Sequence, residues 1–518
     1  MSEIVSLPDS WILTTINEVC DFHAGFGFPT EMQGVADQDL PFYKVKDVSI
    51  AWLAHSSFLL KTEHSLSYED ADRIKAKPVP EGAVVFAKIG EALRLNRRAI
   101  VPRISLIDNN LMGISASPTW LADRYLYWFT IATKFDVDAR ASVVPSIRKS
   151  DVGNLPLPLP PLAEQIRIVA KLEELLSDLD AGVAELKAAQ KKLAQYRQSL
   201  LKAAVEGALT AEWRQQHPPA ETGAQLLQRI LTERRARWEA KQLAKFKEQG
   251  KTPSKDWQKK YPEPVQPDTS GLPDLPQGWV WASVDMLGEI ASGVAKGTKR
   301  DASTVVREVP YLRVANVQRG YLDLSEVKAI LATERDIEEL TLVGGDVLFN
   351  EGGDRDKLGR GWVWREEVEG CIHQNHVFRM RPYLPELQPE LISHHGNSFG
   401  KLWFQNAGKQ TTNLASINMS MLKAFPVPVA PAEEQVEVLE QIRAQLDSLD
   451  RQAAAAELAL KQSTAQRQNI LRAAFAGQLV PQDPADEPAS VLLARIRAER
   501  AERDTLKTPR RSKAKEPA

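Results

Sequence analysis

Two long stretches of the chain place apolar residues in a seven-residue rhythm. In the first stretch the two columns of this rhythm are Leu162, Val169, Leu176, Val183, Gln190, Arg197, Ala204 and Gln165, Leu172, Leu179, Leu186, Leu193, Leu200, Gly207. The second stretch keeps the same register, with Leu439, Leu446, Leu460 in one column and Ile442, Leu449, Ile470 in the other. This pattern predicts two helices that pack on each other as a coiled coil within the chain. About 45 residues of helix would span roughly 70 Å.

Proline and glycine mark the expected ends of these helices. The Pro-rich run 156–161 cannot sit inside a helix but suits an extended lead-in and a first turn. Gly207 and Gly477 are natural helix stops. Arg197 and Arg467 occupy matching seam positions where an apolar residue is expected. Each is either an arginine whose charge reaches solvent at the end of the seam, or a contact that fixes the register or binds a partner.

The two helical stretches are copies of one segment. Residues 154–210 match residues 424–480 at a constant offset of 270 and without a gap. The repeat continues through the segments before each helix, where the offset drifts, and the pairs there are Trp11 and Trp279, Pro41 and Pro310, Gly82 and Gly345, and Ser146 and Ser416. Beyond the helices, 226–230 matches 492–496. We therefore expect a pseudo-two-fold object, and such an object suits a partner with two halves.

Each half begins with a globular region of about 150 residues. Runs such as 83–87 and 346–349 lie between Gly and Pro turn signals and predict strands, whereas 121–135 predicts a short helix. The expected fold class is α+β. Gly25 falls on Gly293 in the repeat, so a repeated structural turn explains it better than a cofactor-binding Gly-rich loop.

Length and composition narrow the class of protein. A chain of 518 residues is too long for one core and should form two or more domains. Cys20 and Cys371 are its two cysteines, which excludes a disulfide framework and fits a reducing cytoplasm. No apolar run reaches the roughly 18 to 20 residues of a membrane span, and residues 1–4 do not begin like a signal peptide. We therefore expect a soluble, cytoplasmic protein.

Net charge is −2, which argues against a protein that coats nucleic acid by bulk electrostatics. The charges are nevertheless clustered. Residues 88–103 contain five basic residues and one acid, and residues 229–260 contain eleven basic residues and four acids. Local basic surfaces are therefore expected.

Catalytic signatures are missing from the sequence. There is no Asn/Asp-Pro-Pro-Tyr tetrapeptide of an amino-methyltransferase and no Gly-rich phosphate loop ending in Gly-Lys-Ser/Thr. His373 with His376, and the pair 394–395, lack a third metal ligand at a recognisable spacing. Acids 351, 354 and 356 stand among basic residues and favour a solvated loop over a magnesium site. We expect no catalytic and no metal-binding residue.

Basic and amide side chains remain as candidates for reading DNA, because Arg, Lys, Asn and Gln carry the donors that contact bases and phosphates. In the first globular region the candidates are Lys44, Lys46, Lys88, Arg94, Arg97, Arg98 and Arg148. In the second they are Arg313, Asn316, Arg319, Arg355, Lys357, Arg360, Lys409 and Gln410.

With these features the chain resembles the specificity subunits of type I restriction-modification enzymes. The resemblance rests on the paired Leu-Pro-x-x-Trp openings at 7–11 and 275–279, on the Pro-rich lead-ins that end in Glu-Gln, and on the helix ends 203–207 and 473–477. It covers nearly the whole chain in the order of that family. No single motif is very specific, but the duplicated arrangement is.

The resemblance implies a non-catalytic subunit with two target-recognition domains, each reading one half of a bipartite double-stranded DNA site. An antiparallel helix pair would set the spacer and dock two modification subunits, which methylate adenine, and restriction subunits would join for ATP-dependent cleavage. S-adenosylmethionine, ATP and Mg²⁺ would be used by these partner subunits, and this chain would bind none. The candidate docking and spacer residues are Glu164, Gln165, Leu172, Leu179, Arg197, Glu434, Gln435, Ile442, Leu449 and Arg467.

On this scheme the parts of the chain follow in a simple order. They are a first recognition domain (1–153), a central helical spacer (154–243), a Pro/Lys-rich linker (244–274), a second recognition domain (275–423), a C-terminal helical spacer (424–507) and a disordered basic tail (508–518). The basic stretch 234–261 has no counterpart of its length after the second helix. It would touch DNA phosphates or a modification subunit, or serve as a disordered connector.

Two other classes of protein stay open at this point. A pure scaffold would use the coiled coil to dimerise proteins and the globular parts to bind peptides. An enzyme fused to its own recognition domain would need a catalytic block of a few hundred residues, for which the chain leaves no space.

Overall fold

The computed structural model describes residues 7–135, 145–295, 297, 304–353, 357–407, 409–410 and 415–507. It divides into two units, one formed by residues 1–187 and 457–518 and the other by residues 188–456. The division falls within both long helices, so each unit contains a piece of each helix. The expected tail 508–518 lies outside the described residues.

Among the described residues of the first unit, the strands form three small sheets. The four-stranded sheet has the order β2-β8-β5-β6, the three-stranded sheet β4-β3-β7, and β1 pairs with β9. The bounds are β1 (Ile12–Thr15), β2 (Asp21–Ala24), β3 (Leu40–Tyr43), β4 (Ser65–Leu66), β5 (Val84–Ala87), β6 (Arg98–Ile100), β7 (Leu106–Ile107), β8 (Leu111–Ser115) and β9 (Pro156–Leu159). Its shorter helices are α1 (Ile16–Val19), η1 (Thr30–Met32), α2 (Val45–Leu53), α3 (Tyr68–Arg73), α4 (Glu91–Arg94), α5 (Asp123–Ala132), α6 (Lys149–Gly153) and α16 (Ala489–Lys507).

The second unit repeats this topology sheet by sheet. Its orders are β11-β18-β14-β16, β13-β12-β17 and β10-β21, with a further small sheet β15-β20-β19. The bounds are β10 (Val280–Ser283), β11 (Gly288–Ser292), β12 (Arg307–Leu312), β13 (Lys328–Ala332), β14 (Val347–Asn350), β15 (Gly352–Gly353), β16 (Gly361–Val363), β17 (Ile372–His373), β18 (Val377–Pro382), β19 (Lys409–Gln410), β20 (Ala415–Ser416) and β21 (Pro426–Val429). Its shorter helices are α8 (Ala211–Gln216), α9 (Gly223–Glu248), η2 (Trp257–Lys260), α10 (Val284–Leu287), α11 (Glu334–Leu340), α12 (Pro389–Asn397), α13 (Phe399–Ala407) and α14 (Met419–Ala424).

The long helices are α7 (Leu162–Val205) and α15 (Ala432–Phe475). The Pro-rich lead-ins are strands β9 and β21, and Gly207 and Gly477 both have a φ of 71° just after the helices, as a left-handed stop requires. The sequence predictions are confirmed for the ends of both long helices, for the strands at 83–87 and 346–349, and for the helix within 121–135. Leu172 and Leu176 are buried in the first unit and Ile442 and Leu449 in the second, as the seam predicts.

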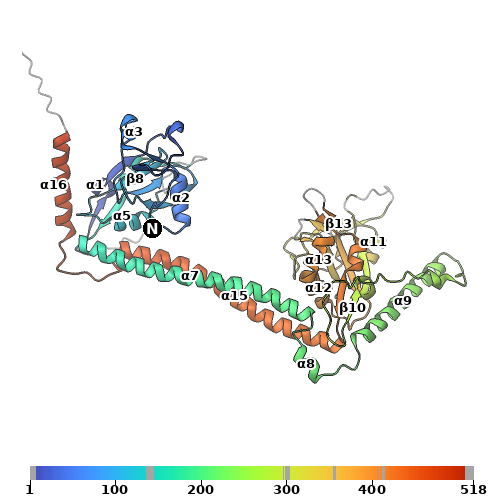
Figure 1. Ribbon diagram of the computed structural model, residues 1–518. Coiled ribbons are helices and arrows are strands. Elements are labelled where there is room, and N and C mark those ends of the chain that lie inside the picture. Colours follow the sequence, from blue (N-terminus) through green and yellow to red (C-terminus); the bar gives the residue numbers. More distant parts are fainter. Residues whose placement is uncertain are drawn as a thin grey trace, which may run out of the picture. The chain divides into compact units, whose positions relative to one another are not determined.

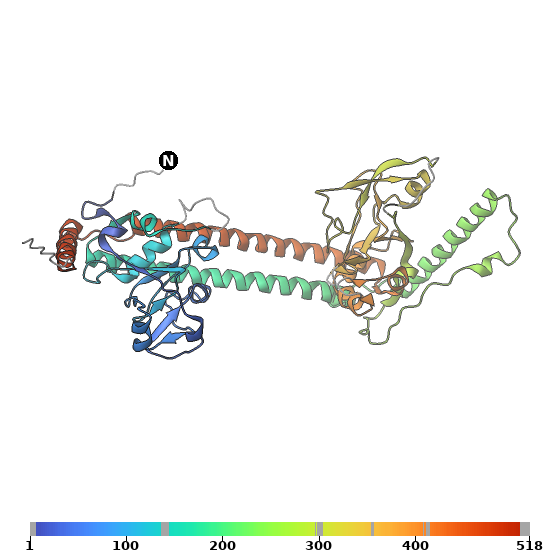
Figure 2. The same ribbon diagram turned by 90° about the horizontal axis from the view of Figure 1, so that it is seen from above.

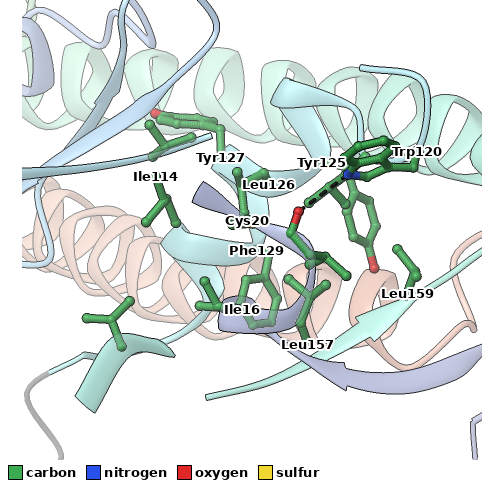
Figure 3. Packing of buried hydrophobic residues seen from close by; sticks show 14 of the residues in the cluster. Ile16, Cys20, Ile114, Trp120, Tyr125, Leu126, Tyr127, Phe129, Leu157 and Leu159 are labelled. Carbon is green, nitrogen blue, oxygen red and sulfur yellow. Dashed lines mark hydrogen bonds between the residues drawn. The ribbon is translucent and has the colours of Figure 1, made fainter. Parts of the chain in front are cut away.

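Each core joins the sheets to a helix that arrives from elsewhere in the sequence. In the first unit, Ile16, Tyr125 and Leu157 lie in one buried cluster (Figure 3). Leu492 and Ile496 belong to the same cluster and come from α16, the helix labelled beside this unit in Figure 1. In the second, α9 supplies Leu226 and Ile230 to the same place in the core. The match between 226–230 and 492–496 is therefore a repeated packing surface, whose leucine and isoleucine side chains are withdrawn from water.

Residues 234–261 are ordered in the structure rather than a disordered connector. Helix α9 continues to Glu248, beyond the expected boundary at 243, and η2 folds within the expected linker. The linker prediction is corrected here, because stacked aromatic side chains hold the returning chain against the helix.

Candidate nucleic-acid interface

A turn at 108–110 organises the basic residues of the first unit. The amide of Asp108 donates to the carbonyl of Tyr43 at 2.9 Å, and the amide of Lys88 donates to the carbonyl of Asn110 at 3.0 Å. A Cβ atom added at Gly25 would lie 1.8 Å from the carbonyl oxygen of Asp108, so glycine is required by the close approach of this turn. The segment after β3 and the segment after β5 are thereby held beside one turn.

Further contacts bring residues from the end of the domain to the same rim. The amide of Ile147 donates to the carbonyl of Lys88 at 2.9 Å, so Arg148 follows directly at this place. Helix α4, which carries Arg94, begins one residue after Gly90, whose amide donates to the carbonyl of Pro145 at 3.0 Å. We call Lys44, Lys46, Lys88, Arg94, Arg97 and Arg148 the first rim.

Several residues of the first rim are engaged with side chains of the chain itself. Lys44 donates to Gln33 at 2.8 Å, Lys46 pairs with Glu63 at 3.2 Å, and Arg94 pairs with Glu91 at 3.5 Å. The two exposed ion pairs, those of Lys46 and Arg94, contribute about 0 to 1 kcal/mol each. They can therefore be exchanged for phosphate contacts at little cost.

Arg98 is not part of a surface, which corrects the prediction for this residue. Its side chain is fully buried in β6, donates to Asn96 Oδ1 at 2.6 Å and lies over the rings of Phe86 and Phe135. These contacts compensate the removal of the guanidinium from water. Arg98 supports the loop that carries Arg97 and cannot reach a ligand.

The second unit builds a rim around an equivalent turn, at 374–376. The amide of Gln374 donates to the carbonyl of Leu312 and that of Glu351 to the carbonyl of His376, both at 2.9 Å. A Cβ atom at Gly293 would lie 1.8 Å from the carbonyl oxygen of His373, which repeats the restriction at Gly25 and confirms the repeated structural turn. We call Arg313, Arg319, Lys357 and Arg360 the second rim.

Asn316 is buried and serves the fold, so the prediction that it contacts DNA is wrong. Its side-chain oxygen accepts from the amide of Arg313 at 3.0 Å, and its Nδ2 donates to the carbonyls of Asp323 and Glu326, each at 2.9 Å. Every strong donor of the amide group is occupied, and the loop that presents Arg313 is held in place.

The remaining candidates of the second unit stand in different situations. Arg313 pairs with Glu326 at 3.1 Å, and Arg319 donates to the carbonyl of Asn397 at 2.7 Å. Lys409 and Gln410 form strand β19, which pairs with β20, but their side chains lie outside the described residues, as does Arg355. A DNA contact by these residues stays a prediction.

The Glu-Gln pairs lie at the junctions between the globular parts and the long helices. Gln435 accepts from the amide of Gln388 at 2.9 Å and donates to the carbonyl of Ala430 at 2.8 Å. Gln165 accepts from the amide of Ala122 at 2.9 Å and donates to the carbonyl of Trp120 at 3.0 Å. Ala122 and Gln388 are the N-cap residues of α5 and α12, so each glutamine ties a domain helix to a long helix.

Glu434 accepts from three side chains within the second unit. These are Thr210 at 2.7 Å, Trp279 Nε1 at 2.8 Å and Arg214 at 2.7 Å. Glu164 is equally buried, accepts from Gln482 at 2.7 Å, and its pKa is raised by that burial, with Trp11 and Gln482 opposing the shift. Because all four junction residues are buried, they shape the joints and offer no surface to a partner subunit.

Both seam arginines make contacts across the helix pair. Arg197 of α7 pairs with Asp450 of α15 in the second unit, and Arg467 of α15 pairs with Asp180 of α7 in the first. The aspartates are themselves repeat partners at the offset of 270. Because both copies of the repeat carry an aspartate at this position, the sequence already contained a signal that could have identified the partners of the two arginines. We call these two contacts the helix clasps. That they set the register of the helix pair stays a prediction.

A wide groove of about 2010 Å³ lies within the second unit, between α12–α13 and the helix pair. Trp362, Trp403 and Leu402 line it, together with Arg443 and the Arg197 clasp. Its mixed apolar and charged lining could accept a protein segment.

Three of the four histidines noted in the sequence are buried in the fold, whereas His376 is exposed and lies 2.5 Å from Glu351. His394 and His395 are buried, and burial lowers the pKa of each to about 4. His373 is buried likewise, with a pKa of about 4, and bonds the carbonyl of Val377 at 2.7 Å. Among the described residues no group of three or more His, Cys, Asp or Glu is arranged to hold a metal ion. Within the same residues, no helix has the length and apolarity to cross a membrane.

Comparison with known proteins confirms the resemblance. Residues 8–189 match the family described as type I restriction modification DNA specificity domain. The chain is 24% identical to the EcoBI type I restriction enzyme specificity subunit of Escherichia coli, over 96% of this chain and 94% of that one. It is 26% identical to the EcoDI specificity subunit of the same species, over 74% and 78%.

Two solved structures share the fold. A chain from a structure on complex assembly and conformational transition of the type I R-M system matches with a TM-score of 0.60 and 18% identity, covering 91% of this chain and 99% of its own. The HsdS subunit from Thermoanaerobacter tengcongensis matches with a TM-score of 0.54 and 18% identity, covering 91% and 98%.

Proposed function

We propose that this chain, a homologue of type I restriction enzyme specificity subunits, is the DNA-recognition subunit of a type I restriction-modification complex. Each globular part reads one half of a bipartite duplex site, and the helices set the spacer between the half-sites. The observation that carries the proposal is the duplicated rim. Two units that share the strand order of three sheets each present basic side chains around an equivalent turn, beside a Gly that this turn requires.

The matched junctions support the division of labour between rims and helices. In each unit a buried Glu-Gln pair fastens the globular part to a long helix, so that a rim has a fixed place on its helix. Proteins that read a split site commonly present one copy of the same recognition element to each half-site. The rims supply the side chains that contact phosphates and bases, and the helices set the distance between the two half-sites.

The partners and cofactors are part of the proposal. Two modification subunits, which use S-adenosylmethionine, dock on the helical regions, and restriction subunits join them for cleavage with ATP and Mg²⁺. This chain contributes recognition and no bond-making step. Recognition of cellular DNA implies a cytoplasmic location.

Methylome sequencing of the host with and without this gene tests the proposal. We expect a split sequence, methylated on adenine in both halves, to lose its methylation when the gene is removed. The complementary measurement is binding of the full chain, purified with its modification subunits, to a duplex that carries this sequence. An unchanged methylome, together with equal affinity for that duplex and a scrambled one, would refute the proposal.

A scaffold that binds a protein segment is the second candidate, because the groove beside the Arg197 clasp has room for one. The two functions separate in the same binding experiment. A scaffold would retain its protein partners but protect no specific duplex.

A further inference from the structure

The segment 235–260 folds into a hairpin on the second unit. The C-terminal half of α9 projects beyond the sheets of this unit in both views, and the chain then returns past η2 (Figures 1 and 2). Trp238 stacks on Trp257 with ring centroids 5.8 Å apart, and Phe246 meets Trp257 edge-on at 6.1 Å. The aromatic side chains therefore hold the two arms together, with offset and edge-to-face contacts that each contribute about 0.5 to 1.5 kcal/mol.

The base of the hairpin is anchored to the domain on both arms. Arg234 donates to the carbonyl of Asp285 at 3.1 Å and to Tyr261 Oη at 2.5 Å. On the returning arm, the amide of Val265 donates to Asp285 Oδ2 at 3.0 Å, and Ser283 donates to the carbonyl of Val265 at 2.6 Å. The hairpin is thus a fixed extension of the second globular part.

Its outer surface is strongly basic and mostly unpaired. From 235 to 260 there are nine basic and three acidic residues. Five exposed lysines have no ion pair or side-chain hydrogen bond with any described residue, and they are Lys245, Lys247, Lys251, Lys255 and Lys260. Like charges gathered in this way repel one another, and an anion that covers them would remove that repulsion.

We infer that the hairpin binds the phosphate backbone of duplex DNA without regard to sequence, outside the bases that the second rim reads. Lysines on a projecting arm are mobile point charges, which suit phosphates and carry no base code. An acidic protein surface is the less fitting partner, because stable protein interfaces need apolar anchors. Among the described residues of the hairpin, Leu243 is the large apolar side chain with substantial exposure, 47%, since the aromatic rings face each other.

The inference rests on the proposed function and extends it. The test replaces the five lysines with glutamine in the full chain, purified with its modification subunits, and a matched variant replaces the same five with arginine. Affinity is measured for the target duplex and for a scrambled duplex at salt concentrations from about 50 to 200 mM. The slope of log affinity against log salt reports how many phosphates the protein neutralises, at about 0.9 per phosphate in duplex DNA.

We expect the glutamine variant to bind both duplexes more weakly by the same factor, with a slope that is shallower by about 0.9 for each phosphate that the variant leaves without a lysine. Its ratio of target to scrambled affinity should be unchanged, and the arginine variant should behave as the unmodified chain. An unchanged slope in the glutamine variant would overturn the inference. So would normal DNA binding combined with loss of the modification subunits, because the surface would then serve a protein partner.

Failure of the proposed function gives a different result. In that case the unmodified chain does not distinguish the target from the scrambled duplex, whatever the hairpin does. A change of slope between lysine and glutamine would still support phosphate binding by the hairpin.

Discussion

The two junctions between a globular part and a long helix use the same residues but hold their buried glutamate differently. Glu434 faces the guanidinium of Arg214 and two further donors, whereas Glu164 accepts from the neutral amide of Gln482 and has a raised pKa. A buried carboxylate needs either a compensating charge or a proton. The repeat therefore preserves the architecture of the joint more strictly than its electrostatics.

The rims differ more than the junctions do. Both units keep the turn, the required glycine and the strand order, and basic residues recur at three equivalent positions, Lys44 and Arg313, Arg94 and Lys357, and Arg97 and Arg360. The other cations of the first rim, Lys46, Lys88 and Arg148, have no basic counterpart, because Ala315, Glu351 and Asn418 stand in their places. Constant junctions and variable rims suit a protein that recognises two different DNA sequences with a set spacing between them. The following experiments probe this contrast between constant and variable parts.

Exchange of residues 1–153 for the corresponding domain of another family member should have the largest effect. We expect one half of the recognised sequence to change completely while the other half and the spacer persist, because the rims of the two units are built separately. Methylated sites mapped in cells that carry the exchanged gene give the answer. A change in both halves, or in neither, contradicts separate reading.

Insertion of about four residues, roughly one helical turn, at matched positions in α7 and α15 tests the constant part of the molecule, the long helices. The spacer should lengthen while both half-sites stay the same, because the insertion leaves the rims and junctions untouched. The same mapping of methylated sites measures it. Altered half-sites with an unaltered spacer would show that the helices do not set the separation.

Substitution of each junction glutamate by glutamine should change the stability of its own unit by a different amount, because the two carboxyl groups have different partners. Glu434→Gln leaves the largely buried Arg214 without its carboxylate and should destabilise the second unit by about 2 to 4 kcal/mol. Glu164→Gln retains the neutral contacts and should be neutral or slightly stabilising near pH 7. Chemical denaturation with hydrogen exchange at each junction reports the two effects. Equal losses at both sites would show that the junctions are electrostatically alike.

The pH dependence of the first unit follows from the raised pKa of Glu164, whose ordinary value is 4.5. Because the folded state holds this proton more tightly than the unfolded chain, the proton stabilises the fold below the ordinary pKa. That stabilisation is lost as pH rises from about the ordinary value through the raised one. Hydrogen exchange near α7 Leu162 across this window should show the loss, and Glu164→Gln should abolish it.

The helix clasps should give the smallest effect. Arg197 and Asp450 have side chains that are 42% and 63% exposed, so their coupling in a double-mutant cycle to alanine should be about 0.2 to 1 kcal/mol. Exchange of the two residues should restore what either single charge reversal removes. A coupling of zero, with an unchanged methylation spacer in both charge-reversal variants, would show that the clasps do not set the register of the helices.

Much of the architecture could be foreseen, because it depends on periodic patterns. The seven-residue rhythm and the glycine stops predicted both long helices, and the offset of 270 predicted two halves of one design. The Gly25 and Gly293 match predicted a structural turn, which the close carbonyl in each unit explains. Periodicity and repetition are properties of the chain alone, so they can be read without coordinates.

The candidate site was less accessible, because burial depends on partners that are distant in sequence. Arg98 and Asn316 carry the right chemistry for DNA, but the fold encloses both and occupies their donors. The order of residues 234–261 depends on Trp238 meeting Trp257 across a returning chain, and composition alone allowed a loose connector.

Local patterning was thus sufficient for the helices, the duplication and the resemblance to a family, since each needs nothing beyond spacing along the chain. The folded structure was required to show which charges face solvent, which glutamate has a countercharge and which aromatic residues close the hairpin. The physical reason is that desolvation and ion pairing are set by three-dimensional neighbours, and these came from Arg214, Gln482 and Trp257, remote from the residues whose behaviour they determine.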